Sequence, residues 1–154
     1  MEDGMKKGLL GVLVICFFAW GMMAGSDKVI GDYEGDIKIA KGTIKIKSEA
    51  DVQGNIFIEE GDLFIGEEVD INGSITIKKG NIFIKRNVTI QKFIVVGNGN
   101  ITIGMNGDVM GKIECKKGIV KLGANTDVKG DIWAMKLIPG LNSNIGKFHE
   151  TKKK

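Results

Sequence analysis

The sequence is poor in the residues that build reactive or cross-linked sites. It has one histidine, one proline and two cysteines among 154 residues. Cys16 lies in an apolar leader, so Cys115 stands alone in the body and a disulfide framework within the chain is excluded. His149 lies in the terminal tail without evident catalytic partners, and no Cys/His cluster provides a zinc site. We therefore expect a solvated tail histidine, a buried inert Cys115 thiol, and no catalytic residue, metal or cofactor.

Aromatic residues and helix formers are also scarce. Phe, Trp and Tyr make up 6% of the chain, whereas hydrophobic residues make up 43% and glycine occurs 23 times. The hydrophobic fraction excludes a disordered chain. Abundant glycine with little Ala, Leu and Gln favours an all-β fold with many tight turns. The net charge of +3 is too small to indicate nucleic acid as a partner.

One long apolar run lies near the start of the sequence. Lys6 and Lys7 precede an uncharged stretch over 8–25, and polar residues follow from Ser26. Residues 1–26 are interpreted as a secretory signal peptide or as a membrane anchor, because the run is near the lower length limit for a span. The two lysines favour a cytoplasmic N-terminus. The body is therefore expected outside the cytoplasm, with the cytoplasmic face of the membrane as the alternative.

The rest of the chain carries an internal repeat. Glycines separated by 19 residues, or by twice that number, stand at Gly35, Gly54, Gly73, Gly111 and Gly130, and Lys92 fills the missing place. Counted from these places as register 0, registers 2, 4, 9, 11, 15 and 17 of the five complete units are apolar except at Gly107 and Thr126. The register-2 column, predicted to form the core, consists of Ile37, Ile56, Ile75, Ile94, Ile113 and Ile132. Self-similarity of this kind is typical of a solenoid.

The three apolar pairs of each unit predict three short strands with a corner after each. Parallel stacking pairs each strand with its counterpart one unit later, about 4.8 Å along the axis. Corner glycines at registers 0 and 7 are expected to adopt backbone angles that other residues resist. Parallel crossovers favour a right-handed coil. We predict an all-β, right-handed parallel β-helix, a triangular solenoid of 19-residue coils with about five to six turns, preceded by an N-terminal apolar helix.

The segment boundaries follow from the repeat. Residues 27–34 are a linker or N-terminal cap, 35–138 the β-helix domain, and 139–154 a C-terminal cap and basic tail. Pro139 falls at register 9, where it is expected to end strand pairing. Leu141 and Ile145 are expected to stay in phase with the inward columns.

The ends of the predicted solenoid and its outward aromatic residues are the candidate contacts. A terminal coil exposes strand edges and core side chains unless something covers it. Candidate end-to-end contacts are Ile30, Tyr33, Leu141, Ile145 and Phe148. Candidate lateral contacts are Phe57, Phe64 and Phe83, of which the last two share register 10 and are expected to stack. Ordinary cross-strand packing is the alternative interpretation of these rings.

The carboxylates of the second unit are the densest polar cluster. Glu67 and Glu68 are predicted to lie on a corner beside Arg86 and Asn87. The long groove with paired acids that a glycoside-cleaving β-helix needs has no counterpart in these uniform units. A solvated corner with a Glu67–Arg86 ion pair is therefore favoured over a cation site or a catalytic site.

The segment over 123–138, GANTDVKGDIWAMKLI, resembles the bactofilins, a bacterial family of polymer-forming cytoskeletal proteins. Their domains repeat a G-A-x-V-x-G-x-I pattern, matched here by Gly123, Ala124, Val128, Gly130, Asp131, Ile132 and Ala134. Residues 106–113 and 49–56 look like further copies, and the resemblance covers about residues 35–138. It implies a right-handed β-helix that stacks end to end into non-polar filaments without nucleotide.

On this resemblance the expected function is that of a structural, self-assembling scaffold and not of an enzyme. Its partners would be further copies of itself, as a homopolymer, and the membrane through the N-terminal segment. The alternative is a monomeric exported β-solenoid that binds a cell-wall glycan or acts as an adhesin. A β-helical acyltransferase or lyase is a third interpretation, for which the sequence offers no catalytic constellation.

Overall fold

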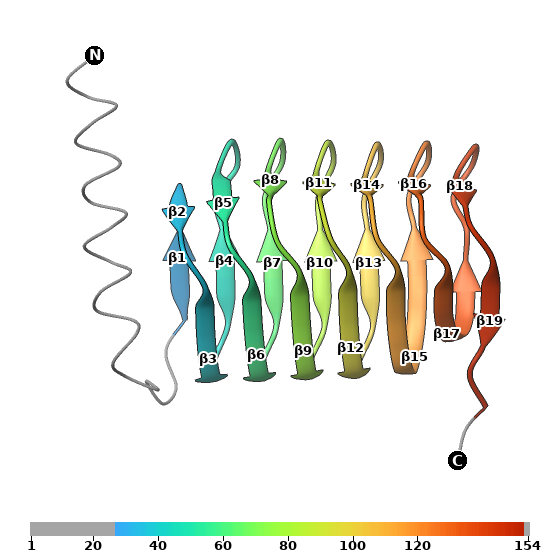
Figure 1. Ribbon diagram of the computed structural model, residues 1–154, viewed down its shortest axis with the longest axis horizontal. Helices are drawn as coiled ribbons and strands as arrows, with labels where there is room; N and C mark the ends of the chain where they lie inside the picture. Colours follow the sequence, from blue (N-terminus) through green and yellow to red (C-terminus); the bar gives the residue numbers. More distant parts are fainter. Residues whose placement is uncertain (1–26, 153–154) are drawn as a thin grey trace.

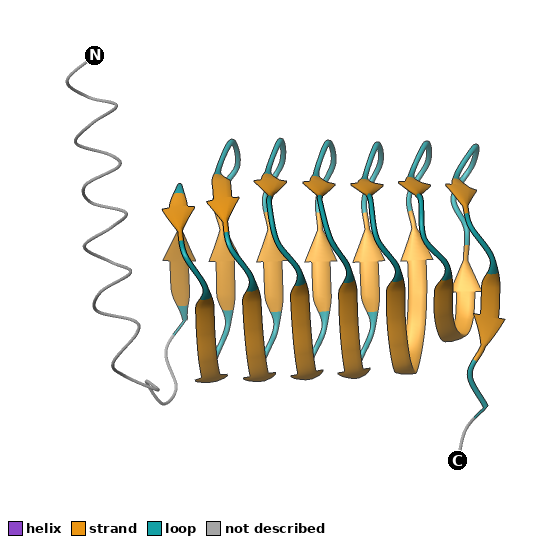
Figure 2. Ribbon diagram, in the orientation of Figure 1, coloured by secondary structure: helices purple, strands orange, loops and turns teal. Residues whose placement is uncertain are grey.

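The computed structural model describes residues 27–152. In this range the chain consists of strands and loops with no helix, as Figure 2 shows. It winds coil after coil along one axis, from β1 at one end to β19 at the other (Figure 1). The predicted signal peptide or anchor and its apolar helix lie outside the described residues.

Each coil contributes one strand to each of three sides. The first side contains β3 (Ile37–Lys41), β6 (Ile56–Glu60), β9 (Ile75–Lys79), β12 (Ile94–Asn98), the first part of β15 (Ile113–Leu122), the first part of β17 (Ile132–Ile138) and β19 (Phe148–Glu150). The second side contains β1 (Lys28–Ile30), β4 (Ile44–Ile46), β7 (Leu63–Ile65), β10 (Ile82–Ile84), β13 (Ile101–Ile103) and the second parts of β15 and β17. The third side contains β2 (Tyr33–Glu34), β5 (Asp51–Gln53), β8 (Asp70–Ile71), β11 (Thr89–Ile90), β14 (Asp108–Val109), β16 (Asp127–Val128) and β18 (Asn144–Ile145).

Neighbouring coils pair in parallel at the spacing of the repeat. Ile56 pairs with Ile37 on one side and with Ile75 on the other, 19 residues away in each direction. The backbone groups of one coil therefore bond to the coils before and after it, which keeps strands as short as two residues fully paired. The prediction of an all-β solenoid with parallel 19-residue coils is confirmed.

The inward side chains form the core between the three sides. The six isoleucines of the register-2 column are between 0% and 1% exposed. Thr126, one of the two interruptions of the apolar pattern, is 1% exposed. Its hydroxyl lies 2.9 Å from the carbonyl oxygen of Gly123 and 3.2 Å from that of Gly104, so the buried polar group has acceptors.

The corner between the first and second sides requires glycine for two reasons. At register 7, Gly42, Gly61, Gly80 and Gly99 have φ values of 133°, 152°, 143° and 149°, as the sequence predicts, whereas Gly118, inside the continuous strand β15, is not among the positive-φ residues of the described chain. A Cβ on Gly61 would also lie 1.7 Å from the carbonyl oxygen of Gly42. The backbones of stacked corners thus lie so close together that no side chain fits between them.

At register 0, the glycines are needed because a side chain would not fit, and not because the backbone has a positive φ. Gly35 has a positive φ of 113°, but the later register-0 glycines do not appear among the positive-φ residues of the described chain. A Cβ on Gly73 would lie 1.9 Å from the carbonyl oxygen of Gly54. The expectation of special angles at this corner is therefore wrong after the first coil, and close stacking is the reason for glycine.

The last coil is shorter than the others. Leu137 pairs with Val120 and Ile145 with Val128, each 17 residues apart, because the pairing of β17 with β15 shifts after Cys115. The prediction that Leu141 and Ile145 keep the 19-residue phase is therefore wrong. Ile145 continues the column of Val128, and Leu141 is 75% exposed.

The solenoid also extends beyond the predicted range 35–138 at both ends. Residues 28–30 form β1, which pairs with β4, and Tyr33 pairs with Val52. At the other end β19 pairs with β17, with Phe148 opposite Ile132. The predicted N-terminal linker or cap and part of the C-terminal cap thus belong to partial coils.

Candidate functional site

The interior is least covered at the C-terminal end of the solenoid. Leu137, Ile145 and Phe148 continue three inward columns into the last coil. Leu137 and Ile145 are partly buried against the core, and Phe148 is 39% exposed, whereas Ile132 in the same column is 0% exposed. Within residues 27–152, β18 pairs with β16 alone and β19 with β17 alone. Apolar side chains and unpaired strand edges therefore coincide at this end.

The other predicted end contacts occupy different environments. Ile30 and Tyr33 are 6% and 4% exposed and belong to the core. Burial, together with the nearby Asp36 carboxylate, raises the pKa of Tyr33. Leu141, at 75%, is the most exposed of the large apolar side chains in the described part of the chain. Of the five candidates, Leu141, Ile145 and Phe148 lie in the last coil.

His149 is held in a cluster on the outward face of the last coil. Its ring stacks on that of Trp133 at a centroid distance of 4.7 Å, and its Nε2 lies 2.9 Å from Oδ2 of Asp131. The backbone N–H of Lys147 donates to Oδ1 of Asp131, and this bond, with the one to His149, lowers the pKa of Asp131. The His149 side chain is 42% exposed, so the expected solvation holds in part, but β19 pairs with β17 and brings the ring against Trp133 and Asp131.

The predicted aromatic ladder is confirmed on the second side. The rings of Phe64 and Phe83 stack with centroids 4.9 Å apart and planes 11° apart, and they are 38% and 40% exposed. Phe57 lies in β6 on the first side, with Nζ of Lys78 5.4 Å from its ring centroid. The structure therefore brings two of the three candidate lateral contacts together and leaves the third on another side.

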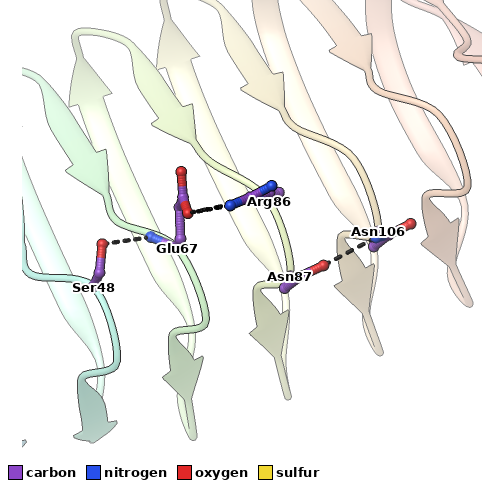
Figure 3. Close-up of polar contacts among 5 residues, drawn as sticks. All are labelled: Ser48, Glu67, Arg86, Asn87 and Asn106. Atoms are coloured by element: carbon purple, nitrogen blue, oxygen red, sulfur yellow. Dashed lines mark hydrogen bonds and ion pairs between the residues drawn. The ribbon is translucent and has the colours of Figure 1, made fainter.

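The corner between the second and third sides carries polar ladders from coil to coil (Figure 3). The Ser48 hydroxyl oxygen accepts a hydrogen bond of 3.0 Å from the Glu67 backbone N–H, and Glu67 pairs with Arg86 at 3.0 Å. Next to this row, the Asn106 side-chain amide donates to Oδ1 of Asn87 at 2.9 Å. The predicted Glu67–Arg86 ion pair is thus confirmed, at an exposed place where such pairs contribute little stability.

Sequence reasoning missed the backbone conformation of this corner. Non-glycine residues take a left-handed conformation once in every coil, with φ between 54° and 62°, at Glu49, Glu68, Asn87, Asn106, Asn125 and Asn142. Asparagine tolerates this region better than most residues. The column of asparagines at a 19-residue interval was the signal that could have found it.

No group of three or more His, Cys, Asp and Glu side chains in residues 27–152 is placed to hold a metal ion. The same range contains no helix with the length and apolarity needed to cross a bilayer.

Cys115 is buried in the core at register 4. It is 0% exposed, and its Sγ lies 3.0 Å from the carbonyl oxygen of Gly99. Desolvation raises the pKa of the Cys115 thiol from 9.0 to about 11. The thiol is therefore protonated and shielded in the folded protein, as predicted.

The shifted pKa of Cys115 predicts a loss of stability in alkali. Between pH 9.0 and about 11 the thiol of the unfolded chain ionises while the buried thiol does not, so stability falls as pH rises. Cys115→Ala is expected to lose less stability across this window, and Ala134 shows that alanine fits the same column one coil later. Urea unfolding of both proteins below and above the window measures the difference, and equal losses would contradict the assignment.

Comparison of the chain with protein-family models, with curated protein sequences and with solved structures found no match.

Proposed function

We propose that the chain is a structural scaffold of bactofilin type whose solenoids associate end to end through the last coil. The observation that carries this proposal is the uncovered C-terminal end, where Leu137, Ile145 and Phe148 leave the core partly exposed beside unpaired edges. Unpaired edges are templates for further strands. A second copy of the solenoid end supplies both an apolar surface and strand edges of matching spacing.

The proposal includes a triangular, right-handed winding. The default hand of parallel crossovers supports it. The view in Figure 1 also supports it, because the nearer strands run downward and the fainter, more distant strands run upward as the chain advances from β1 to β19. The V-x-G-x-I part of the bactofilin pattern recurs at 52–56, 109–113 and 128–132, which supports the bactofilin type.

The proposed location is at or beyond a membrane. The apolar run over 8–25, with Lys6 and Lys7 before it, supports attachment to the membrane or export across it. The three outward sides remain available to envelope partners, because end-to-end association uses only the terminal coils.

Phe148→Ser is expected to reduce assembly strongly. The substitution removes an apolar ring at the exposed end of the core and puts a hydroxyl in its place, which weakens apolar association there. Sedimentation velocity and negative-stain microscopy over a range of concentrations measure the effect. Wild-type protein is expected to form larger particles as concentration rises, and the variant is expected to stay small.

Phe93→Ser is the matched control, because Phe93 is also 39% exposed but lies on a corner in the middle of the solenoid. It is expected to assemble like wild type. Thermal unfolding of both variants shows whether the fold is intact. A wild-type protein that stays monomeric at every concentration would overturn the scaffold proposal and favour the alternative of a monomeric solenoid that binds glycan.

A further inference from the structure

Positive charge gathers on the second side of the solenoid. This side comprises residues 43–47, 62–66, 81–85, 100–104, 119–123 and 136–140 between β4 and the end of the last coil. It carries five lysines, namely Lys45, Lys47, Lys85, Lys121 and Lys136. None of the five forms an ion pair within the described part of the chain. The one acid on these residues is Asp62, whose Oδ1 accepts hydrogen bonds from the backbone and side-chain amides of Asn81.

Together with β1, which pairs with β4, the same side carries half of the exposed large apolar side chains of the described residues. These are Val29, Phe64, Phe83, Ile119 and Ile138, which are 61%, 38%, 40%, 37% and 38% exposed. The pairing of the strands places Val29 beside Lys45 and Ile138 beside Lys121, with the stacked rings of Phe64 and Phe83 between them along the axis. Apolar groups and lysines are thus interleaved along the middle column of this sheet face, in the order Val29, Lys45, Phe64, Phe83, Thr102, Lys121 and Ile138.

The third side has the opposite character. Residues 50–53, 69–72, 88–91, 107–110, 126–129 and 143–146 contain four aspartates that face outward in register, Asp51, Asp70, Asp108 and Asp127. The one lysine there, Lys129, is paired with Asp127. The second side therefore combines apolar groups with an excess of lysines and the third side carries carboxylates, whereas the first side mixes lysines with Glu59, Glu60 and Glu114.

We propose that the second side is a docking surface for an anionic lipid bilayer. A bilayer surface offers negative headgroups to the lysines and an apolar boundary to the rings and aliphatic chains, and few other partners offer both over a flat area. Lysine stems can lie along the apolar strip while their ammonium groups reach the headgroups. The solenoid would then lie with its axis along the membrane plane.

A second copy of the chain fits this side less well. The third side of another copy would supply the opposite charge, but its outward places hold mostly carboxylates and polar groups, and Met110, 38% exposed, is the one exposed large apolar side chain among the described residues of that side. Contact would bury aspartate carboxylates against Phe64 and Phe83, which costs the carboxylates their hydration. The bilayer avoids this cost because its charge and its apolar layer lie at different depths.

The position of the apolar leader in the sequence agrees with this orientation. The run over 8–25 ends three residues before β1 begins at Lys28, and β1 belongs to the second side. Three extended residues reach about 10 Å. An anchored leader would therefore hold the second side near the headgroups. The inference does not depend on end-to-end assembly, because a monomer and a polymer present the same second side.

The test compares two matched threonines on opposite sides of the full chain. Thr102 lies between Phe83 and Lys121 on the second side, and Thr89 lies between Asp70 and Asp108 on the third side. Each is replaced by cysteine in a Cys16→Ser background, with Cys115 left buried, and is labelled with an environment-sensitive fluorophore. The proteins are reconstituted into phosphatidylcholine vesicles with and without phosphatidylglycerol, together with a lipid that carries a quencher on its headgroup.

The label at position 102 is expected to be quenched several-fold more than the label at 89 in vesicles with phosphatidylglycerol. The difference is expected to shrink without the anionic lipid or at high salt. Lys45→Gln with Lys121→Gln should weaken it, since each lysine near an anionic surface contributes about fivefold in binding. Lys38→Gln with Lys117→Gln, on the first side, is the matched control and should leave it unchanged.

Two outcomes would overturn the proposal. One is equal quenching at 102 and 89, or stronger quenching at 89. The other is a contact between copies, detected as cross-linking between the 102 position of one chain and the 89 position of another, without quenching at 102. Particle size in the same samples reports end-to-end assembly separately, so failure of the scaffold proposal and failure of this inference give different results.

Discussion

Replacing Gly80 with alanine is expected to lower the free energy of unfolding by about 3–5 kcal/mol. This figure is the sum of the cost of straining the backbone and the cost of overpacking the site. Gly80 has a φ of 143°, and its added Cβ would lie 1.8 Å from the carbonyl oxygen of Gly61. Neither backbone can move aside easily, because the Gly80 N–H is bonded to the carbonyl oxygen of Asn98 in the next coil. Urea unfolding followed by circular dichroism measures the loss.

Gly31→Ala is the control for this substitution. Gly31 lies between β1 and β2, and a Cβ added there would meet no atom within 4 Å. The variant is expected to stay within about 0.5 kcal/mol of wild type. If Gly80→Ala proved as mild as Gly31→Ala, the close stacking of the register-7 corners would be incorrect.

Ile94→Ala is expected to destabilise the protein by about 2–5 kcal/mol, the range for removing a fully buried aliphatic side chain. Ile94 is 0% exposed and pairs with Ile75 before it and with Ile113 after it. The cavity would lie in the middle of the stack, where the coils on both sides limit collapse. Chemical unfolding measures the global effect, and hydrogen exchange shows whether protection is lost first in the coils next to position 94.

Ile138→Ala is the matched substitution at the surface. Ile138 is 38% exposed and faces outward beside Lys121. Because little apolar area is lost from the interior, the expected cost is below about 1 kcal/mol. Equal costs for Ile94→Ala and Ile138→Ala would contradict the assignment of the register-2 column to the interior.

The interior of the fold could be predicted from the sequence because every coil requires apolar residues at the same registers. An inward place must be apolar, so columns such as that of Ile56 and Ile75 are visible as a 19-residue period. The stacking of Phe64 on Phe83 follows from the same period, since equal registers must lie side by side. Predictions of this kind depend on spacing alone and not on the detailed path of the chain.

The ends could not be predicted in the same way, because the period stops there. Leu141 and Ile145 happen to fall on inward registers when counted by 19, yet the last coil is two residues shorter and places them differently. The environment of His149 depends on the return of β19 to β17, a tertiary contact with no counterpart in earlier coils. The last segment could therefore be named from the sequence as a candidate end, while the positions of its side chains required the structure.

The left-handed corner residues show a different limit. Glu68 and Asn87 take the same backbone conformation although their side chains differ in charge and shape. Tertiary stacking imposes the conformation on whichever residue occupies the place. The sequence therefore signals this corner where asparagine occupies it, as at Asn87, but not where glutamate does, as at Glu68.

Because the offset between paired strands is a constant 19 residues, the length of the solenoid is set by the number of its coils. Each complete coil presents the next with the same backbone pattern and adds about 4.8 Å to the length of the rod. Duplicating one unit of the gene in phase would lengthen the rod by one step without disturbing the units on either side. The length of the solenoid can therefore be changed in steps of one coil without changing the side chains of the terminal coils.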